Sequence, residues 1–275
     1  MSGLARELAE ATALAERAGA LVVAARAAGL VVEHKAGDEP VTAADRDAST
    51  LIVAGLHAAF PADVVVSEEL EDDLARLGAD RVWFVDPIDG TKDFIRGGDG
   101  FAVMIGLVVG GVPVVGVVHQ PSIDRTFAAI AGQAATVRER GQPARAIAVS
   151  TVSDPAQARL VASASHRSAV IDDVKEALGT HDELNIGSVG VKLALIAAGA
   201  RDLYVNPAGR CKAWDTCAPE VILRAAGGVL TNLHGDPLRY DQPDLRLPHG
   251  LVGSNQHLHA AVVGKLAALF PRRPA

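Results

Sequence analysis

The sequence has few cysteines, few aromatic residues and no long apolar run. Its two cysteines, Cys211 and Cys217, are too few for a disulfide framework, and a C-x5-C pair lacks the four ligands of a structural zinc. We expect two reduced thiols, with Cys217 a small packing residue. Because no stretch approaches about 18 apolar residues, no transmembrane helix is predicted. The N-terminus alternates charge, unlike a signal peptide, so a cytoplasmic protein without a membrane partner is expected.

Positive charge is also in deficit. The net charge of −7 disfavours a broad surface for nucleic acid or anionic membranes. It leaves open a small anionic substrate, because bound divalent cations can invert the local field. Hydrophobic residues make up 49% of the chain and aromatic residues 4%, which predicts a large aliphatic core.

The 275 residues exceed the usual size of a single domain, so an internal boundary is expected. A polar stretch with Gly and Pro spans 139–155 and predicts two subdomains, 1–145 and 146–275. The first part shows helices over 3–28 and 42–60 and a hairpin of strands 103–109 and 112–119 joined by two glycines. The second alternates strands and helices. These patterns predict an antiparallel N-terminal half (α+β) and a mixed α/β C-terminal half.

The most informative segment is Trp83–Lys92, WFVDPIDGTK. Its apolar start predicts a buried strand that ends at Asp86-Pro87. Two carboxylates three residues apart and a Gly-Thr pair follow, so hard oxygen ligands and backbone N–H groups could face one spot. That arrangement is typical of a Mg²⁺-dependent phosphate site. An Asx-type turn after a strand is an equally weighted alternative for this motif taken alone.

Other acidic residues lie at predicted element ends. Glu68 and Glu69 end a strand, and Asp215 opens a helix after Trp214. A single acid at such a position is most often solvated surface. Their combination with Asp86 and Asp89 favours one joint site.

Together these motifs resemble a known superfamily. The chain is similar to the lithium-sensitive, Mg²⁺-dependent sugar phosphatases, which include inositol monophosphatase. The resemblance lies in three motifs: E-E, W-x-x-D-P-I-D-G-T, and W-D before an apolar helix ending in Gly-Gly. The resemblance spans about Lys35 to Gly228 and implies a layered α-β-α-β-α sandwich. Lys92 and the segment 211–223 resemble the 3′(2′),5′-bisphosphate nucleotidases of the CysQ type more closely, as do 116–121 and 163–166.

The resemblance implies roles for the acidic residues. Two or three Mg²⁺ ions would be bound by Glu68, Asp86, the Ile88 carbonyl, Asp89 and Asp215. This agrees with the preference of Mg²⁺ for oxygen ligands. Asp45 and Thr91 match the pair that activates water, whereas a dipole-stabilising acid in a first helical turn is the alternative for Asp45. Glu69 is a weaker candidate, because the first Glu is the direct ligand in the family pattern.

The substrate side also follows from the resemblance. The N–H groups of Gly90 and Thr91 would hold the phosphate. The family pattern places Ser163, His166, Ser188 and Lys192 around a nucleotide, with Lys192 near its second phosphate. Arg210 and Lys212 are further candidates for that phosphate, and Lys35 is equally well explained as an exposed loop lysine.

The resulting expectation is a lithium-sensitive enzyme of sulfur assimilation that hydrolyses adenosine 3′,5′-bisphosphate to AMP and phosphate. One alternative is a phosphatase of the same superfamily acting on inositol phosphates or sugar phosphates. Another is a regulatory module that binds metal or nucleotide without turnover. Dimers are common in the superfamily, so a homodimer is also an expectation.

Overall fold

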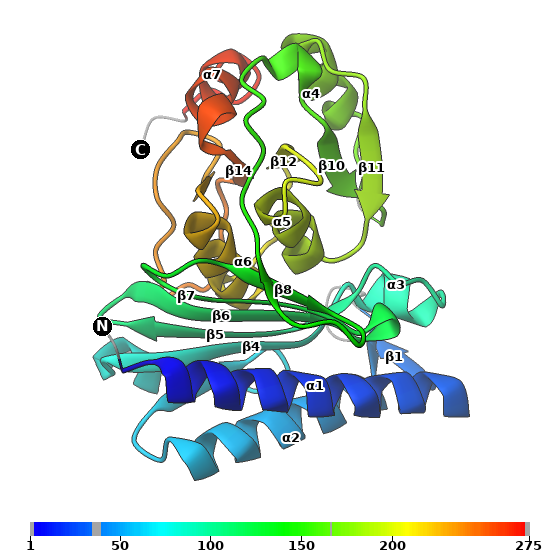
Figure 1. Ribbon diagram of the computed structural model, residues 1–275, viewed down its shortest axis with the longest axis vertical. Helices are drawn as coiled ribbons and strands as arrows, with labels where there is room; N and C mark the ends of the chain where they lie inside the picture. Colours follow the sequence, from blue (N-terminus) through cyan, green and yellow to red (C-terminus); the bar gives the residue numbers. More distant parts are fainter. Residues whose placement is uncertain (1–2, 35–39, 166, 273–275) are drawn as a thin grey trace.

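The computed structural model describes residues 3–34, 40–165 and 167–272 and shows five layers (Figure 1). Helices α1 and α2 cover one face of a seven-stranded sheet, and α5 and α6 lie between this sheet and a five-stranded sheet. Helices α4 and α7 cover the far face of the second sheet. The predicted α-β-α-β-α sandwich is confirmed. The predicted site residues Lys35 and His166 lie outside the described residues.

The elements have the following bounds. The helices are α1 (Ala5–Ala28), α2 (Ala43–Ala59), α3 (Thr91–Ile95), α4 (Val170–Leu178), α5 (Val189–Ala197), α6 (Ala213–Ala225) and α7 (Gln256–Leu266), with 3-10 turns at Ala75–Gly78, Pro121–Ile123 and Pro155–Gln157. The strands are β1 (Val32–His34), β2 (Pro40–Thr42), β3 (Val64–Ser67), β4 (Arg81–Asp89), β5 (Ala102–Val109), β6 (Val112–Gln120), β7 (Arg125–Ile130), β8 (Thr136–Glu139), β9 (Arg145–Ala146), β10 (Leu160–Ser163), β11 (Glu183–Ile186), β12 (Leu203–Asn206), β13 (Gly228–Thr231) and β14 (Leu251–Asn255). Across the described ranges, none of the helices has the length and apolarity to cross a membrane.

The first sheet has the strand order β3-β4-β5-β6-β7-β8-β9. Val109 pairs with Val112, and Gly110 and Gly111 have φ of 56° and 79°. Two consecutive residues with positive φ suit the twist of a two-residue hairpin loop, so the predicted hairpin is confirmed. The sheet is antiparallel except that β3 pairs with β4 in parallel. This pair brings the carboxyl ends of both strands to the same edge.

The second sheet has the order β11-β10-β12-β14-β13 and mixes parallel with antiparallel pairs, as predicted. The residues of α5 are almost all buried, because this helix is enclosed by both sheets. The first sheet draws on residues 64–146 and the second on 160–255. The division of the chain at 145/146 stays a prediction.

Two predicted boundaries near the site are wrong. Strand β4 does not end at Asp86 but continues through Pro87 to Asp89, with a register shift against β5 between Asp86 and Asp89. A bulge tolerates Pro87, because an unpaired residue there needs no N–H donor. Helix α6 begins at Ala213, so Asp215, which was predicted to open the helix, lies inside its first turn.

Candidate metal and phosphate site

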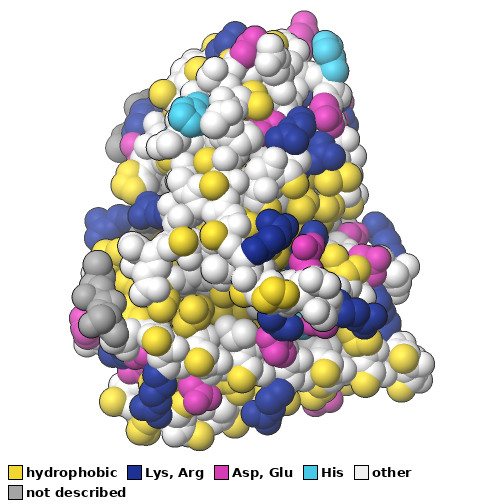
Figure 2. Space-filling view, viewed as in Figure 1, with side chains coloured by type: hydrophobic (Ala, Val, Ile, Leu, Met, Phe, Trp, Pro, Cys, Tyr) yellow, Lys and Arg dark blue, Asp and Glu magenta, His cyan; other side chains and the backbone are white. Residues whose placement is uncertain are grey.

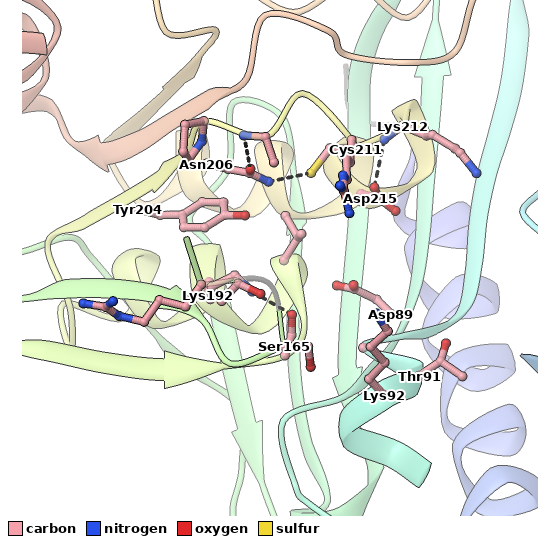
Figure 3. Close-up of a pocket in the computed structure, with 18 of the residues that line it drawn as sticks. Asp89, Thr91, Lys92, Ser165, Lys192, Tyr204, Asn206, Cys211, Lys212 and Asp215 are labelled. Carbon is pink, nitrogen blue, oxygen red and sulfur yellow. Dashed lines mark hydrogen bonds between the residues drawn. The ribbon is translucent and has the colours of Figure 1, made fainter. Parts of the chain in front are cut away.

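A cavity of about 450 Å³ opens where the carboxyl ends of strands from both sheets meet the start of α6 (Figure 3). One side carries acidic side chains at the ends of β3 and β4 and in the first turn of α6. The other side carries the end of β12, the loop after it and basic side chains. The cavity is lined among others by Glu68, Asp89, Gly90, Thr91, Lys92, Ser163, Arg167, Lys192, Tyr204, Asn206, Arg210, Cys211, Lys212 and Asp215.

Four of the predicted acidic ligands form one electrostatic cluster. The pKa of Asp86 is raised well above its usual range by burial and by the charges of Glu68, Asp89 and Asp215. Burial, Asp89 and Glu68 raise the pKa of Asp215 in the same way. Asp86 and Asp89 are only 2% and 7% exposed, so water cannot screen their repulsion. Such a cluster needs a cation to stay ionised.

Asp89 is supported from the opposite half of the chain. Its Oδ2 accepts the Ser188 hydroxyl at 2.5 Å and the backbone N–H of Gly190 at 2.8 Å. Ser188 also caps α5 by accepting the N–H of Val191 at 2.9 Å. Burial raises the pKa of Asp89, while Lys192 and these hydrogen bonds oppose the rise. Ser188 is fully buried, and its hydroxyl is donated to Asp89, so the structure gives it a supporting position behind the cavity wall.

The predicted water-activating pair comes together. The Thr91 hydroxyl lies 3.4 Å from Oδ1 of Asp45 and 3.0 Å from the carbonyl oxygen of Ile88. Oδ2 of Asp45 accepts both the backbone N–H and the hydroxyl of Thr42 at 2.7 Å. These two bonds fix the carboxylate at the start of α2, with its other oxygen, Oδ1, towards the Thr91 hydroxyl.

Gly90 forms the tight turn from β4 to α3, at a point where the second half of the chain packs closely against it. Its φ is +91°, and a Cβ there would lie 2.9 Å from the carbonyl oxygen of Gly100 and 3.0 Å from the backbone nitrogen of Ser188. Only glycine fits such a conformation and such contacts. The close approach keeps the Gly90-Thr91 backbone at the cavity wall.

Lys192 lies at the floor of the cavity and is 1% exposed. Its Nζ donates to the carbonyl oxygens of Ile186 at 3.0 Å and Gly187 at 2.7 Å, and lies 5.3 Å from the ring centroid of Tyr204. Burial lowers the pKa of Lys192 to about 8, with Asp89 opposing the shift. Two of its three donors are therefore used by the backbone.

Further basic residues line the cavity, among them Arg167, Arg210 and Lys212. The Arg167 guanidinium is held by Glu183 at 2.6 Å and by Asp172 at 2.5 Å. Lys212 Nζ lies 5.0 Å from the ring centroid of Trp214. Arg210 is exposed, and within the described part of the chain it has no hydrogen bond or ion pair.

The loop that carries Arg210 is braced by a side chain that the sequence motifs did not indicate. Asn206 accepts the N–H of Ala208 at 3.0 Å and donates to Sγ of Cys211 at 3.1 Å. Tyr204 also faces the cavity, and its ring is labelled beside Asn206 in Figure 3. Both residues lie at the carboxyl end of β12. An Asn next to a Pro-Ala-Gly stretch after a strand was the available signal for this turn.

Two weaker candidates take separate places. Ser163 lines the cavity at the end of β10. Glu69 is half-buried and is close enough to Arg46 to contribute to the raised pKa of that guanidinium. The two neighbouring glutamates therefore have different surroundings: Glu68 lines the cavity, whereas Glu69 lies near Arg46.

The donor set fits a hard divalent cation. The acidic residues offer carboxylate oxygens, and Cys211 is the one soft donor among the lining residues described above. Across the described ranges, no three acidic, cysteine or histidine side chains are arranged closely enough to hold one ion as they stand. A bound cation would relieve the mutual repulsion of these carboxylates.

Comparison with known proteins identifies the class. The model of the inositol monophosphatase family matches residues 4–269, so the chain belongs to this family. A solved inositol monophosphatase from Anabaena superposes with a TM-score of 0.78 at 26% identity, covering 98% of this chain and 97% of that one. An inositol monophosphatase from Thermotoga maritima gives a TM-score of 0.78 at 27% identity, with 93% and 94% covered.

Curated relatives are bisphosphate nucleotidases by name. The chain is 36% identical to the 3′-phosphoadenosine 5′-phosphate phosphatase of Mycobacterium tuberculosis over 215 residues, 77% of each chain. It is also 36% identical over 214 residues to the 3′(2′),5′-bisphosphate nucleotidase CysQ of Escherichia coli, covering 76% of this chain and 82% of that protein. Enzymes of the family generally depend on a metal.

Proposed function

We propose that this chain is a Mg²⁺-dependent phosphomonoesterase that removes the 3′-phosphate of adenosine 3′,5′-bisphosphate, giving AMP and phosphate. The observation that carries the proposal is the division of one cavity into an acidic end and a basic wall. A substrate with two phosphates suits both parts: a metal-bridged phosphate at the acidic end and a second phosphate at the basic wall. The names of the curated relatives support the same substrate class.

Glu68, Asp86, the Ile88 carbonyl, Asp89 and Asp215 would hold two or three Mg²⁺ ions. The raised pKa values of Asp86 and Asp215 support this, because they express a repulsion that cations would relieve. When bound, Mg²⁺ supplies Lewis-acid stabilisation of the phosphoryl oxygens and makes water a stronger nucleophile.

The other residues of the acidic end would handle the proton and the phosphate. Thr91 would pass a proton from the attacking water to Oδ1 of Asp45, which faces its hydroxyl. The N–H groups of Gly90 and Thr91 would bind the phosphate oxygens at the turn where only glycine fits.

The second phosphate would be bound by Arg210 and Lys212. Arg210 is exposed on the braced loop, and an arginine fork can bind phosphate through two hydrogen bonds. Lys192 would act from the floor through its charge, since two of its donors hold Ile186 and Gly187. Ser163 would contact the ribose or the base from the end of β10.

Positive and negative side chains are interspersed on the face shown in Figure 2 and do not gather into a large basic area. The sequence carries 33 acidic against 26 basic residues, excluding histidine. A small nucleotide therefore fits this chain better than a nucleic-acid strand does.

Phosphate release measured with Mg²⁺ tests the proposal. Adenosine 3′,5′-bisphosphate, inositol 1-phosphate and fructose 1,6-bisphosphate are compared at equal enzyme concentration. We expect kcat/KM for the nucleotide to exceed the others by ~100-fold, about 2.7 kcal/mol at the transition state. A preference for inositol 1-phosphate would retain the metal site but reject the nucleotide assignment, and absence of turnover with measurable Mg²⁺ binding would favour a regulatory module.

A further inference from the structure

The acidic cluster brings together two carboxylates from distant parts of the chain. Glu68 follows β3, and Asp215 lies in the first turn of α6. Their charges repel, since Glu68 contributes to the raised pKa of Asp215. Contacts elsewhere must hold their two elements together at this edge.

One segment connects both elements. We call residues 238–247 the strap. On one side, the strap carbonyl of Leu245 accepts the N–H of Ala213 at 2.8 Å, and the N–H of Leu247 donates to the carbonyl of Cys211 at 2.7 Å. These bonds attach the strap immediately before Asp215. The strap is also tied to α6 itself, because the Tyr240 hydroxyl donates to Thr216 at 3.1 Å.

On its other side the strap meets the connection 69–80, which runs from Glu68 to β4. Arg76 in this connection is 4% exposed. Its Nη1 donates to the carbonyl of Gln242 at 2.6 Å, its Nη2 to the carbonyl of Pro243 at 2.7 Å, and its Nε to Oδ2 of Asp72 at 2.9 Å. Nothing in the sequence of this acidic stretch indicates a buried cation.

Hydrophobic burial does not explain how the connection is held. Its leucines Leu70, Leu74 and Leu77 are 49%, 49% and 43% exposed. Leu74 adopts a φ of +64°, a conformation that costs a non-glycine residue free energy. The two bonds of Arg76 attach the connection to the strap, and losing them would leave a buried guanidinium without these partners, which is costly.

We propose that Arg76 is a positioning residue that sets the separation of Glu68 and Asp215 through the strap, and so tunes the affinity of the acidic cluster for its divalent cation. The inference rests on the proposed metal site. It assigns Arg76 no contact with substrate. Lysine cannot replace it fully, because one ammonium cannot reproduce the three fixed donor directions.

The first test measures Mn²⁺ binding to the full chain by calorimetry. Arg76→Met should weaken Mn²⁺ binding at least ~10-fold, and Arg76→Lys should fall between this variant and the parent. KM for the nucleotide at saturating Mg²⁺ should stay within ~2-fold. Arg246→Met is the matched control, because Arg246 lies in the strap but its side chain is 71% exposed and pairs with Asp244 at 2.7 Å.

Parent-like Mn²⁺ affinity in Arg76→Met would overturn the inference, even if the variant melts at a lower temperature. If the parent itself binds no Mn²⁺, that result contradicts the proposed metal site, on which the role of the strap rests. A variant that does not fold leaves a second test on the parent chain. If the strap tunes metal affinity, bound metal must in return stabilise the hydrogen bonds of the strap and the connection. Mn²⁺ should therefore slow hydrogen exchange of the Ala213, Leu247 and Leu77 amides. Unchanged exchange at these amides under saturating Mn²⁺ would contradict the proposal.

Discussion

The two sides of the cavity are built in opposite ways. The acidic side consists of carboxylates on strand and helix ends, where burial and mutual repulsion raise the pKa of Asp86 and Asp215. On the basic side, Lys192 is buried in the floor, whereas Arg210 is exposed on a loop braced by Asn206. Rigid elements thus carry the groups expected to hold metal, and a loop carries the groups expected to select the substrate. The comparison predicts that substitutions on the first side change kcat and substitutions on the second change KM.

The largest effect is expected at Asp86. Asp86→Asn should lower kcat by at least ~10³-fold, about 4 kcal/mol of barrier, because the acidic cluster loses its central charge. Metal-free protein should become more stable at the same time, since the substitution removes a buried charge that its neighbours repel. Steady-state kinetics and thermal unfolding in chelator measure both. Asp241→Asn, at an exposed ion pair, is the control, and parent-like turnover in Asp86→Asn would refute the assignment.

Thr91 should give the next largest effect. Thr91→Ala should lower kcat by ~10²-fold with little change in metal affinity, because it removes the hydroxyl between the water and Asp45. Thr91→Ser keeps the hydroxyl and should retain most of the activity. Equal loss in both variants would show that Thr91 matters for packing and not for proton transfer.

A smaller effect on the basic side sharpens the contrast. Arg210→Ala should raise KM for adenosine 3′,5′-bisphosphate ~10-fold and leave kcat nearly unchanged, because it removes contacts made equally in the ground and transition states. KM for 3′-AMP, which lacks the second phosphate, should not change. The exposed Arg239 provides the control substitution. A parallel rise in KM for both nucleotides would remove Arg210 from this role.

The smallest effect concerns stability away from the site. His119 is buried between β7 and α1, where its Nδ1 lies 2.9 Å from the Thr126 hydroxyl, and burial lowers its pKa to about 4. The unfolded pKa is about 6.5, so the unfolded chain binds more protons between pH 4 and 6.5. The contribution of His119 is therefore complete above pH 6.5 and lost as the pH falls towards 4, by up to about 3 kcal/mol.

Urea unfolding of His119→Gln against pH measures this contribution. The variant should show a flatter dependence of unfolding free energy between pH 4 and 6.5, whereas the exposed His57→Gln should follow the parent. A parent-like slope in His119→Gln would mean that other groups cause acid unfolding.

Local patterns were sufficient for much of the fold. The glycine pair of the β5–β6 hairpin, the first two helices and the alternation in the second half all depend on neighbouring residues. The acidic motifs were also recognisable, because their residues lie close in sequence or at element ends. The family resemblance then indicated that Asp215 joins Asp86 and Asp89.

Contacts across the two halves could not be predicted in this way. The bond from the Ser188 hydroxyl to Asp89 in the other half was not predicted. The bonds of Lys192 to two carbonyl oxygens of its own half were not predicted either. The substrate contacts expected of both residues stay predictions. Arg76 is buried in an acidic stretch whose composition gives no sign of a buried cation. The partners of Ser188 and Arg76 are 99 and 166 residues away in the sequence, and Lys192 is buried under another layer. Local periodicity carries no information about such contacts.

The most direct test of the divided cavity compares two substrates that share the phosphate to be removed. kcat/KM is measured for adenosine 3′,5′-bisphosphate and for 3′-AMP with the parent enzyme under saturating Mg²⁺. A basic wall that binds the second phosphate predicts at least a ~100-fold advantage for the bisphosphate, about 2.7 kcal/mol. Equal values for the two nucleotides would contradict the account, because the wall would then contribute nothing to substrate selection.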